Sequence, residues 1–144
     1  MTTARSAQLH ASAVAIAGRG CLITGPSGSG KSTLVMEIMA LGGRLVADDR
    51  VDLSRDGDSI HLSAPDRLRG LIEARGIGIL RVDDPIDRAP CAYVVDLGEA
   101  ATRLPMAQYR DLLGVQCPVI LGKTRHGLAA AMVVLLKSGG MVEP

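Results

Sequence analysis

The sequence predicts one α/β domain over residues 1–144, with a mostly parallel central sheet, an added β-hairpin and a buried C-terminal helix. Three observations support this fold class. Short apolar runs alternate with turns rich in glycine, proline and aspartate, a glycine-rich turn joins one such run to a helical pattern, and an apolar segment of helical length closes the chain. A chain of 144 residues is long enough for one core and too short for two ordinary ones.

The first elements are an expected hairpin and a helix. Small and aliphatic residues from Leu9 to Ala17 and an apolar run from Cys21 to Thr24 predict two strands joined by a glycine turn. Apolar residues then recur at three- and four-residue spacing and predict an amphipathic helix that ends at Gly42-Gly43. Since the strand "RLVADD" follows, residues 21–48 form a strand, helix, strand unit, and we expect its second strand to return beside the first.

The second half of the chain is richer in polar residues. Two alternating runs around Asp56-Gly57-Asp58 predict a hairpin, and further strands are expected at residues 76–82, at 91–97 and in "CPVIL". Residues 104–115 have no clear period, and we interpret them as irregular or partly helical. Residues 126–137 are apolar on nearly every side, which predicts a buried helix.

Composition and charge exclude several classes of function. Phe and Trp are absent and the net charge is +1, so the chain has neither stacking platforms for single-stranded nucleic acid nor a basic field. The three cysteines form no C-x-x-C pair, which argues against a disulfide framework and a zinc site. The N-terminus lacks a signal-peptide core, and no apolar run reaches the ~18 residues of a membrane span. We therefore expect a soluble cytoplasmic protein that binds neither nucleic acid nor a membrane.

The segment "GPSGSGKS" fits the phosphate-loop pattern G-x-x-x-x-G-K-[ST] between an expected strand and an expected helix. In such a loop backbone N–H groups point at phosphate oxygens, and the helix N-terminus adds partial positive charge. Lys31 would reach the β- and γ-phosphates, and the Ser32 hydroxyl would ligate Mg²⁺. The predicted phosphate-binding residues are Gly25, Ser27, Gly28, Ser29, Gly30, Lys31, Ser32 and Thr33. The alternative is a flexible glycine-serine turn.

Two carboxylates, Asp48 and Asp49, end the strand that follows the helix. Only 17 residues separate Lys31 from Asp48, so the end of that strand should lie near the phosphates. Successive side chains of an extended chain point to opposite faces, so one aspartate can face the phosphoryl group while the other faces a metal or a neighbour. The carboxylate that faces the phosphoryl group can act as a general base. A solvated turn after the strand is the alternative.

The stretch "GPSGSGKSTLVMEIMALGGRLVADDRVDL" resembles the catalytic core of bacterial HPr kinase/phosphorylase, in which a phosphate loop is followed after one helix by an "LVADD" strand. The segment "LIEARGIGILRV" is similar to the signature of that family, and His10 corresponds to the family's histidine before the loop. Together these similarities cover roughly residues 8–140.

The resemblance implies a P-loop kinase-like fold of the HPr kinase/phosphoenolpyruvate carboxykinase type. It further implies an ATP- and Mg²⁺-dependent serine kinase that phosphorylates HPr, the phosphocarrier of the sugar phosphotransferase system, and that can remove this phosphate with inorganic phosphate. We expect a form consisting of the catalytic domain only, assembled as a homo-hexamer. A small-molecule P-loop kinase and a non-catalytic nucleotide-binding module are the alternatives.

The resemblance also implies roles for single residues. Asp48 would be the base that takes the proton of the substrate serine, and His10 would hydrogen-bond to it. Glu73, Ser32 and Asp49 would hold the metal. Arg103, in "ATRLP", would stabilise charge on the phosphoryl group during transfer. Taken without the resemblance, His10 is more often a structural histidine of an apolar strand, and Glu73 and Arg75 could form a surface ion pair.

Overall fold

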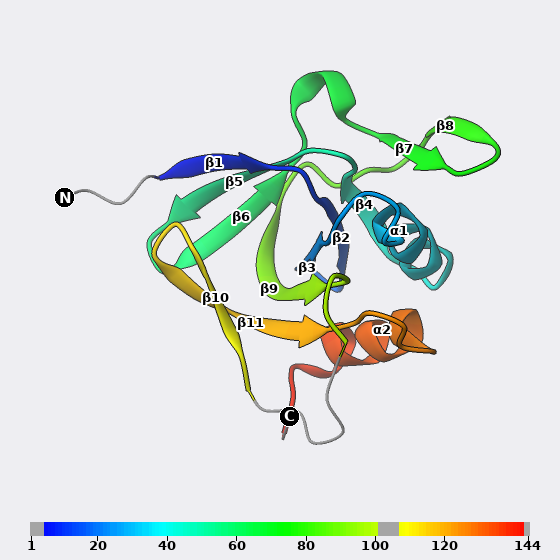
Figure 1. Ribbon diagram of the computed structural model, residues 1–144. Helices are drawn as coiled ribbons and strands as arrows, with labels where there is room; N and C mark the ends of the chain where they lie inside the picture. The colour runs from blue at the N-terminus through cyan, green and yellow to red at the C-terminus, as the bar shows by residue number, and fades with distance from the viewer. Residues whose placement is uncertain (1–4, 101–106, 143–144) are drawn as a thin grey trace.

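A curled sheet forms the centre of the molecule, and two helices cover part of it (Figure 1). This computed structural model describes residues 5–100 and 107–142. The strands in these ranges are β1 (Ser6–Leu9), β2 (Ser12–Ile16), β3 (Arg19–Thr24), β4 (Arg44–Ala47), β5 (Val51–Asp56), β6 (Ser59–Ser63), β7 (Leu71–Ala74), β8 (Gly78–Arg81), β9 (Ala89–Asp96), β10 (Tyr109–Leu112) and β11 (Val115–Leu121). The helices are α1 (Lys31–Ala40), α2 (Leu128–Ser138) and a 3-10 turn at Asp66–Leu68.

Within the described ranges the large sheet has the strand order β1-β5-β6-β9-β3-β2-β4. The start of β9 pairs with β6 and its end with β11, which in turn pairs with β10. Only β3–β9 and β9–β11 are parallel, and every other pairing between described strands is antiparallel. The expectation of a mostly parallel sheet is therefore wrong: β2–β3, β5–β6 and β10–β11 are antiparallel hairpins, and β1, β4 and β9 also pair antiparallel with β5, β2 and β6.

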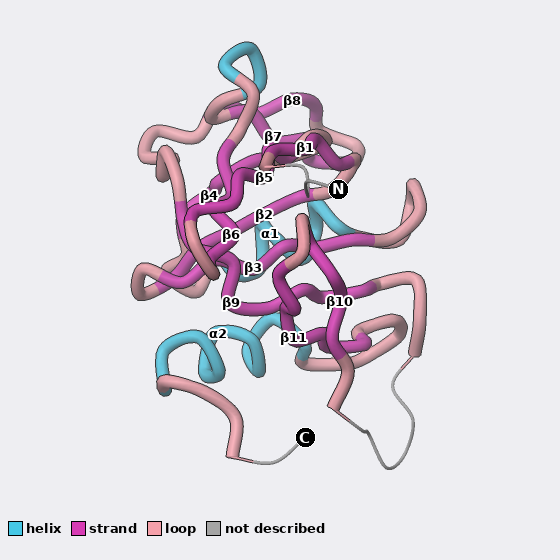
Figure 2. The backbone as a smooth tube through the Cα atoms, turned by 90° about the vertical axis from the view of Figure 1, so that its left-hand side faces the viewer, coloured by secondary structure: helices cyan, strands magenta, loops and turns pink. Residues whose placement is uncertain are grey.

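The central strands are buried on both faces. In β3, Cys21 and Ile23 pack with α1 and α2 in one core, whereas Leu22 between them packs with residues of β5, β6 and β11 in a second core. In Figure 2, α1 lies behind β2 and β3, and α2 lies below β9. A strand covered on both faces has a continuous apolar sequence, which is the pattern usually associated with a parallel sheet.

The strand, helix, strand unit forms with one change of neighbour. The hairpin of β2 and β3 is confirmed, and α1 ends at Gly42-Gly43, where the N–H of Gly43 donates to the carbonyl of Ile38 at 2.9 Å and Gly42 adopts a φ of 108°. However, β4 pairs with β2 and not with β3, so the expectation that it returns beside the first strand is wrong. The reason is that β2 already occupies that edge of β3.

The other expected elements are partly confirmed, and the differences from expectation lie at the edges and the surface of the fold. The β5–β6 hairpin at Gly57, the strand β9 and the strand β11 are confirmed. Residues 109–112, which we expected to be irregular or partly helical, form β10 at the edge of the sheet. Helix α2 is not buried on all sides: Leu128, Met132 and Leu136 face the core, whereas Val134 is 65% exposed. The β7–β8 hairpin projects from the body as a separate two-stranded sheet (Figure 1).

Candidate functional site

The glycine-rich loop between β3 and α1 curls back on itself. At Gly25 the φ angle is 148°, and a Cβ built there would lie 2.6 Å from Oγ of Ser29, so only glycine fits this close approach. Gly30 has a φ of 98°, in the left-handed region, and directly precedes the helix. The sequence therefore forms the tight loop that its glycines predict, at the point where the chain enters α1.

The N-terminus of α1 has no internal partner for its backbone N–H groups. The residue before the helix is Gly30, which offers no side-chain cap, and the first turn contains no acidic side chain. The first N–H groups of an α-helix lack acceptors within the helix and carry a partial positive charge. An anion placed here would receive these hydrogen bonds, which is the arrangement of a phosphate-binding helix terminus.

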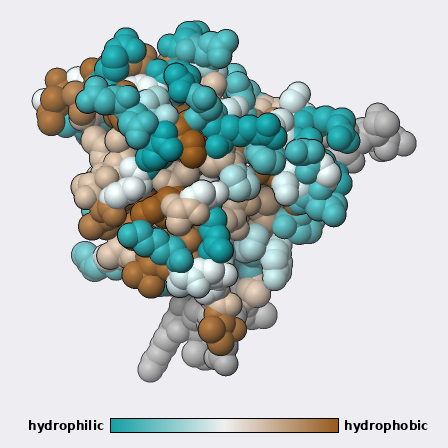
Figure 3. Space-filling model, turned by 180° about the vertical axis from the view of Figure 1, so that it is seen from behind, coloured by the Kyte–Doolittle hydropathy of each residue, from teal (hydrophilic) through white to brown (hydrophobic). Residues whose placement is uncertain are grey.

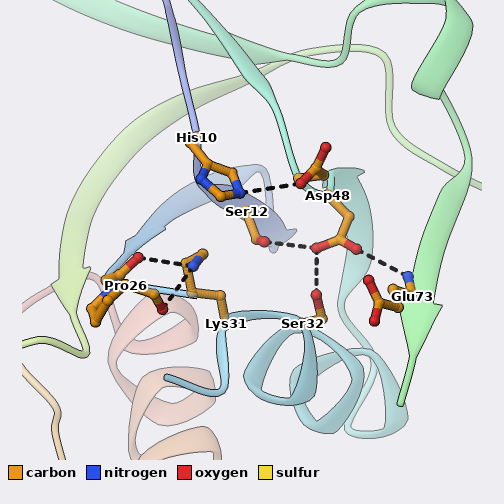
Figure 4. Close-up of polar contacts among 9 residues, drawn as sticks. His10, Ser12, Pro26, Lys31, Ser32, Asp48 and Glu73 are labelled. Atoms are coloured by element: carbon orange, nitrogen blue, oxygen red, sulfur yellow. Dashed lines mark hydrogen bonds and ion pairs between the residues drawn. The ribbon is translucent and has the colours of Figure 1, made fainter. Parts of the chain in front are cut away.

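Two side chains add to the polarity of this loop. The ammonium of Lys31 donates to the carbonyls of Gly25 at 2.8 Å and Pro26 at 3.1 Å, and the residue is 8% exposed (Figure 4). The hydroxyl of Ser29 is buried and has no hydrogen-bond partner among the residues that the structure describes. A buried cation and an unsatisfied hydroxyl in one loop fit an anionic ligand that accepts hydrogen bonds.

Asp48 is the buried carboxylate of the site. Its Oδ1 accepts hydrogen bonds from the hydroxyls of Ser12 and Ser32, both at 2.7 Å, and its Oδ2 accepts one from the backbone N–H of Glu73 at 3.0 Å (Figure 4). The residue is 5% exposed. Donors from β2, α1 and β7 thus converge on one buried carboxylate and satisfy both of its oxygens.

Asp49 points to a different partner from its neighbour. Its backbone adopts a φ of 71°, which a β-strand does not permit, so the chain turns immediately after β4. Oδ1 of Asp49 lies 3.1 Å from Nε2 of His10, and both side chains are about half exposed or more. The expectation that His10 hydrogen-bonds to Asp48 is therefore wrong: the hydroxyls of Ser12 and Ser32 occupy Oδ1 of Asp48, and the turn at Asp49 brings the second carboxylate to the histidine.

These residues line one pocket of about 390 Å³. The loop side is contributed by Ser27, Gly28, Gly30, Lys31, Ser32 and Thr33, and the opposite side by His10, Ser12, Asp48, Asp49, Glu73 and Arg75. Gly25 and Ser29 shape the loop without lining the pocket. A basic and glycine-rich wall therefore faces an acidic wall, an arrangement suited to a phosphate chain with a divalent cation between the two.

The predicted metal ligands share this pocket but are not preassembled. Among the described residues, no three His, Cys, Asp or Glu side chains are grouped as a metal site. Ser32 contacts Asp48 and not Asp49, and the side chain of Glu73 is exposed, while its backbone N–H binds Asp48. The donors are all oxygen, the type that Mg²⁺ prefers, and a bound phosphate would supply further oxygens.

The cysteines take no part in this pocket. Burial raises the pKa of Cys21 to about 12, so this thiol in β3 is a packing group and not a nucleophile. Cys117 is buried in the second core and Cys91 packs against it; the interaction between the two thiols raises the pKa of Cys91 and lowers the pKa of Cys117. All three are free thiols.

With the geometry described, the chain can be compared with known proteins. Residues 1–86 match the family described as the HPr Serine kinase C-terminal domain. The chain belongs to this family. The matching segment of this chain contains the phosphate loop, both aspartates and every residue that lines the pocket.

Individual relatives agree with this assignment. The chain is 49% identical over 75 residues to the HPr kinase/phosphorylase of Limosilactobacillus reuteri (strain DSM 20016), covering 51% of this chain and 23% of that protein. It is 33% identical over 138 residues to the HPr kinase/phosphorylase of Caldicellulosiruptor bescii, covering 87% of this chain and 44% of that protein. The chain thus spans less than half the length of these two HPr kinase/phosphorylases.

The fold of an HPr kinase also matches in three dimensions. The structure described as the Hpr(Ser) kinase/phosphatase from Coxiella burnetii superposes with a TM-score of 0.79 at 27% sequence identity. The alignment covers 92% of this chain and 95% of that chain. No helix among the described residues is long and apolar enough to cross a membrane.

Two pocket residues were missed from the sequence, and one predicted residue lies outside the structure's described ranges. Ser12 gave one available signal: it is the polar residue of an otherwise apolar and fully buried strand, "SAVAI". Arg75 lines the pocket from the β7–β8 hairpin, whereas the sequence indicated only an ion pair between Arg75 and Glu73. Arg103, expected to act during transfer in an HPr kinase, lies in residues 101–106, outside the described residues.

Proposed function

We propose that this chain is an ATP-dependent kinase that phosphorylates a serine of an HPr-type phosphocarrier protein. The observation that carries the proposal is the contact between the two walls of the pocket, in which Ser32 of the phosphate loop donates to Asp48 at 2.7 Å. The names of the curated relatives support the substrate class. In this proposal, the loop binds the triphosphate and the acidic wall receives the serine.

The loop residues have a defined task. The N–H groups of the loop and of α1 would bind the β- and γ-phosphates, and Lys31 would exchange one of its carbonyl contacts for a phosphate oxygen. Such donors stabilise the charge that gathers on the phosphoryl group during transfer.

The cation would be held on the opposite side of the phosphates. We assign Ser32 and Asp48 to this site, with Glu73 at its rim, because the Ser32 hydroxyl and Asp48 already contact each other and all three line the pocket. In P-loop enzymes generally, the loop hydroxyl and a strand-end aspartate share Mg²⁺ in this way. When bound, Mg²⁺ neutralises charge on the β- and γ-phosphates.

The proton of the substrate serine would go to Asp49, supported by His10. The sequence predicted Asp48 as the base and Asp49 as a metal ligand, and the contacts favour the opposite assignment. Asp48 already accepts three hydrogen bonds, whereas Asp49 is accessible and contacts a histidine. As the serine oxygen forms its bond to the γ-phosphorus, the bond to the β-phosphate oxygen breaks, the proton passes to Asp49 and ADP leaves. The reverse direction would transfer the phosphoryl group from phosphoserine to inorganic phosphate and yield pyrophosphate.

The surface that contacts other subunits would include the β7–β8 hairpin. Ile77, Ile79 and Leu80 are exposed by 79%, 65% and 39%, and Figure 3 shows apolar surface at the upper left, where this hairpin projects. Exposed apolar clusters mark protein contacts. We propose that this surface is covered in a homo-oligomer, and that the assembly is a hexamer. The free thiols agree with a reducing, cytoplasmic compartment.

One assay tests the proposal. The protein is incubated with Mg²⁺, γ-labelled ATP and an HPr-type phosphocarrier, and the labelled residue is identified by mass spectrometry. Label on a serine of the carrier, absent when Lys31→Met replaces the wild type, is the expected result. Label that appears only on a small molecule would indicate a small-molecule kinase, and nucleotide binding without transfer would indicate a regulatory module.

A further inference from the structure

A polar cluster at the foot of the phosphate loop lies outside the pocket. It consists of Thr24, the last residue of β3, Asp96, the last residue of β9, and Arg110 of β10. Thr24 and Asp96 are paired neighbours in the parallel register of β3 and β9. None of the three lines the pocket, so they do not belong to the site described above.

Arg110 holds the two strand ends together. One guanidinium nitrogen donates to Oγ1 of Thr24 at 3.1 Å, and the other donates to Oδ2 of Asp96 at 2.8 Å. The second carboxylate oxygen of Asp96 accepts the N–H of Gly98 at 2.7 Å. The side chain of Asp96 is only 13% exposed. A planar guanidinium can span two acceptors in fixed directions, whereas an ammonium cannot reproduce this fork.

The turn after Asp96 lies against the loop itself. A Cβ built on Gly25 would lie 3.2 Å from Cβ of Leu97, and one built on Gly98 would lie 3.5 Å from Cδ of Pro26. The N–H of Leu97 also donates to the carbonyl of Thr24 at 2.8 Å. The first two residues of the phosphate loop are therefore in contact with the turn that Asp96 organises.

We propose that Arg110 is a positioning residue for the phosphate loop, acting through Thr24 and Asp96. This inference rests on the proposed function, because it assumes that the loop binds phosphate. Arg110 fixes where the loop begins: it anchors the hydroxyl of Thr24 next to Gly25, and it orders the turn that supports Gly25 and Pro26. A loop whose N–H groups converge on an anion needs such a fixed origin, since small displacements weaken several hydrogen bonds at once.

Two variants separate the contributions of the cluster. Arg110→Met keeps most of the side-chain length but removes the guanidinium, and Thr24→Val keeps the branched shape but removes the hydroxyl. Arg44→Met is the matched control, because it breaks an Arg–Asp pair at the start of β4, where Arg44 lies 3.0 Å from Asp84. The dissociation constant for MgATP is measured by calorimetry, and amide exchange of residues 24–30 is measured by mass spectrometry.

The expected result is a dissociation constant raised about fivefold or more by Arg110→Met and by Thr24→Val, with a double variant that is no worse than Arg110→Met. Amide exchange in residues 24–30 should increase in both variants but not in Arg44→Met, and Arg110→Lys should recover only part of the affinity. A purely structural role would lower the melting temperature while leaving affinity and loop exchange unchanged at 25 °C, which would overturn the proposal.

The failure of this inference can be told apart from the failure of the proposed function. If the wild type binds neither MgATP nor inorganic phosphate, both are overturned. If the wild type binds MgATP, Lys31→Met binds it about tenfold or more weakly, and Arg110→Met and Thr24→Val match the wild type, the proposed function stands and the inference about Arg110 alone is overturned. If Arg110→Met does not fold, Thr24→Val, which alters only one hydroxyl, decides the outcome.

Discussion

The hydroxyl of Ser32 and Oδ1 of Asp48 lie 2.7 Å apart, although one residue lies in the first turn of helix α1 and the other follows strand β4. This contact joins the glycine-rich wall of the pocket to its acidic wall. Because Ser12 shares the same carboxylate oxygen, the position of Asp48 is fixed from two sides.

Replacing the loop lysine should weaken nucleotide binding and leave the fold intact. Lys31→Met should raise the dissociation constant for MgATP by about 10- to 100-fold, since a hydrogen bond to a charged group contributes about 1.5–3 kcal/mol. Calorimetric titration measures the affinity, and circular dichroism checks the fold. Lys137→Met, at the exposed end of α2, is the control and should bind like the wild type. Unchanged affinity in Lys31→Met would contradict the phosphate-loop assignment.

The two aspartates should respond differently to Mg²⁺. If Asp48 serves the cation, the activity lost in Asp48→Asn should be partly recovered as Mg²⁺ is raised, because a weakened site refills by mass action. Asp49→Asn should lose about 10²- to 10⁴-fold in transfer rate without such recovery, as expected for a lost proton acceptor. A Mg²⁺ titration of the transfer rate measures both variants. If raised Mg²⁺ recovers the transfer rate of Asp49→Asn but not that of Asp48→Asn, then Asp49 serves the cation and Asp48 accepts the proton, as the sequence predicts.

The hydroxyl of Ser12 should stabilise the whole protein. Ser12→Ala leaves Oδ1 of the buried Asp48 with one donor fewer, which should lower the free energy of unfolding by about 1–3 kcal/mol. Urea denaturation measures the change. The control is Ser54→Ala on the exposed side of β5, where we expect a change within about 0.5 kcal/mol. Equal effects of the two substitutions would mean that Ser12 contributes nothing to holding Asp48.

The stability provided by Asp96 should depend on pH. Burial alone would raise the pKa of Asp96, but the hydrogen bonds from Arg110 and Gly98 and the charge of Arg110 outweigh it and lower the pKa. Because the pKa is lower in the folded state than in the unfolded state, the stabilisation is complete above about pH 4 and is lost as the pH falls through the folded value. Urea unfolding of wild type and Asp96→Asn between pH 7 and pH 2.5 should show a constant difference that shrinks below about pH 4. A difference that grows on acidification would contradict this sign.

The β7–β8 hairpin should control assembly. Ile79→Glu places a charge in the exposed apolar cluster of this hairpin and should shift the protein to smaller species in light scattering at micromolar concentration. Ser138→Glu, at the end of α2, is the control and should leave the mass unchanged. A wild-type monomer, or an Ile79→Glu variant of unchanged mass, would contradict the proposed interface.

Local patterns predicted local structure well. The stop of α1 at Gly42-Gly43, the β2–β3 and β5–β6 hairpins and the loop at Gly25 each depend on a few neighbouring residues whose φ angles or turn chemistry are nearly unique. The same applies to the convergence of Lys31, Ser32 and Asp48, which short connections keep close in space.

Relationships between distant strands could not be predicted in this way. The apolar runs of β3 and β9 are compatible with either strand direction, because burial on both faces removes the alternation that marks an exposed antiparallel strand. Strand β10 contains polar residues because it lies at an edge, and its pairing with β11 is a tertiary property. The pairing of His10 with Asp49 depends on a single positive φ angle at a non-glycine residue, which no pattern in the sequence signals.

The segment that matches the family is shorter than the segment that must fold, because of the position of β9. Every pocket residue lies between His10 and Arg75, inside the segment that matches the family, yet β9 is inserted between β6 and β3 in the middle of the sheet. A chain cut after residue 86 would retain every residue that lines the pocket and lose the strand that joins the two halves of the sheet. The residues of the pocket are therefore close together in the sequence, but the sheet that positions them is complete only when β9 (Ala89–Asp96), which follows them in the chain, has been added.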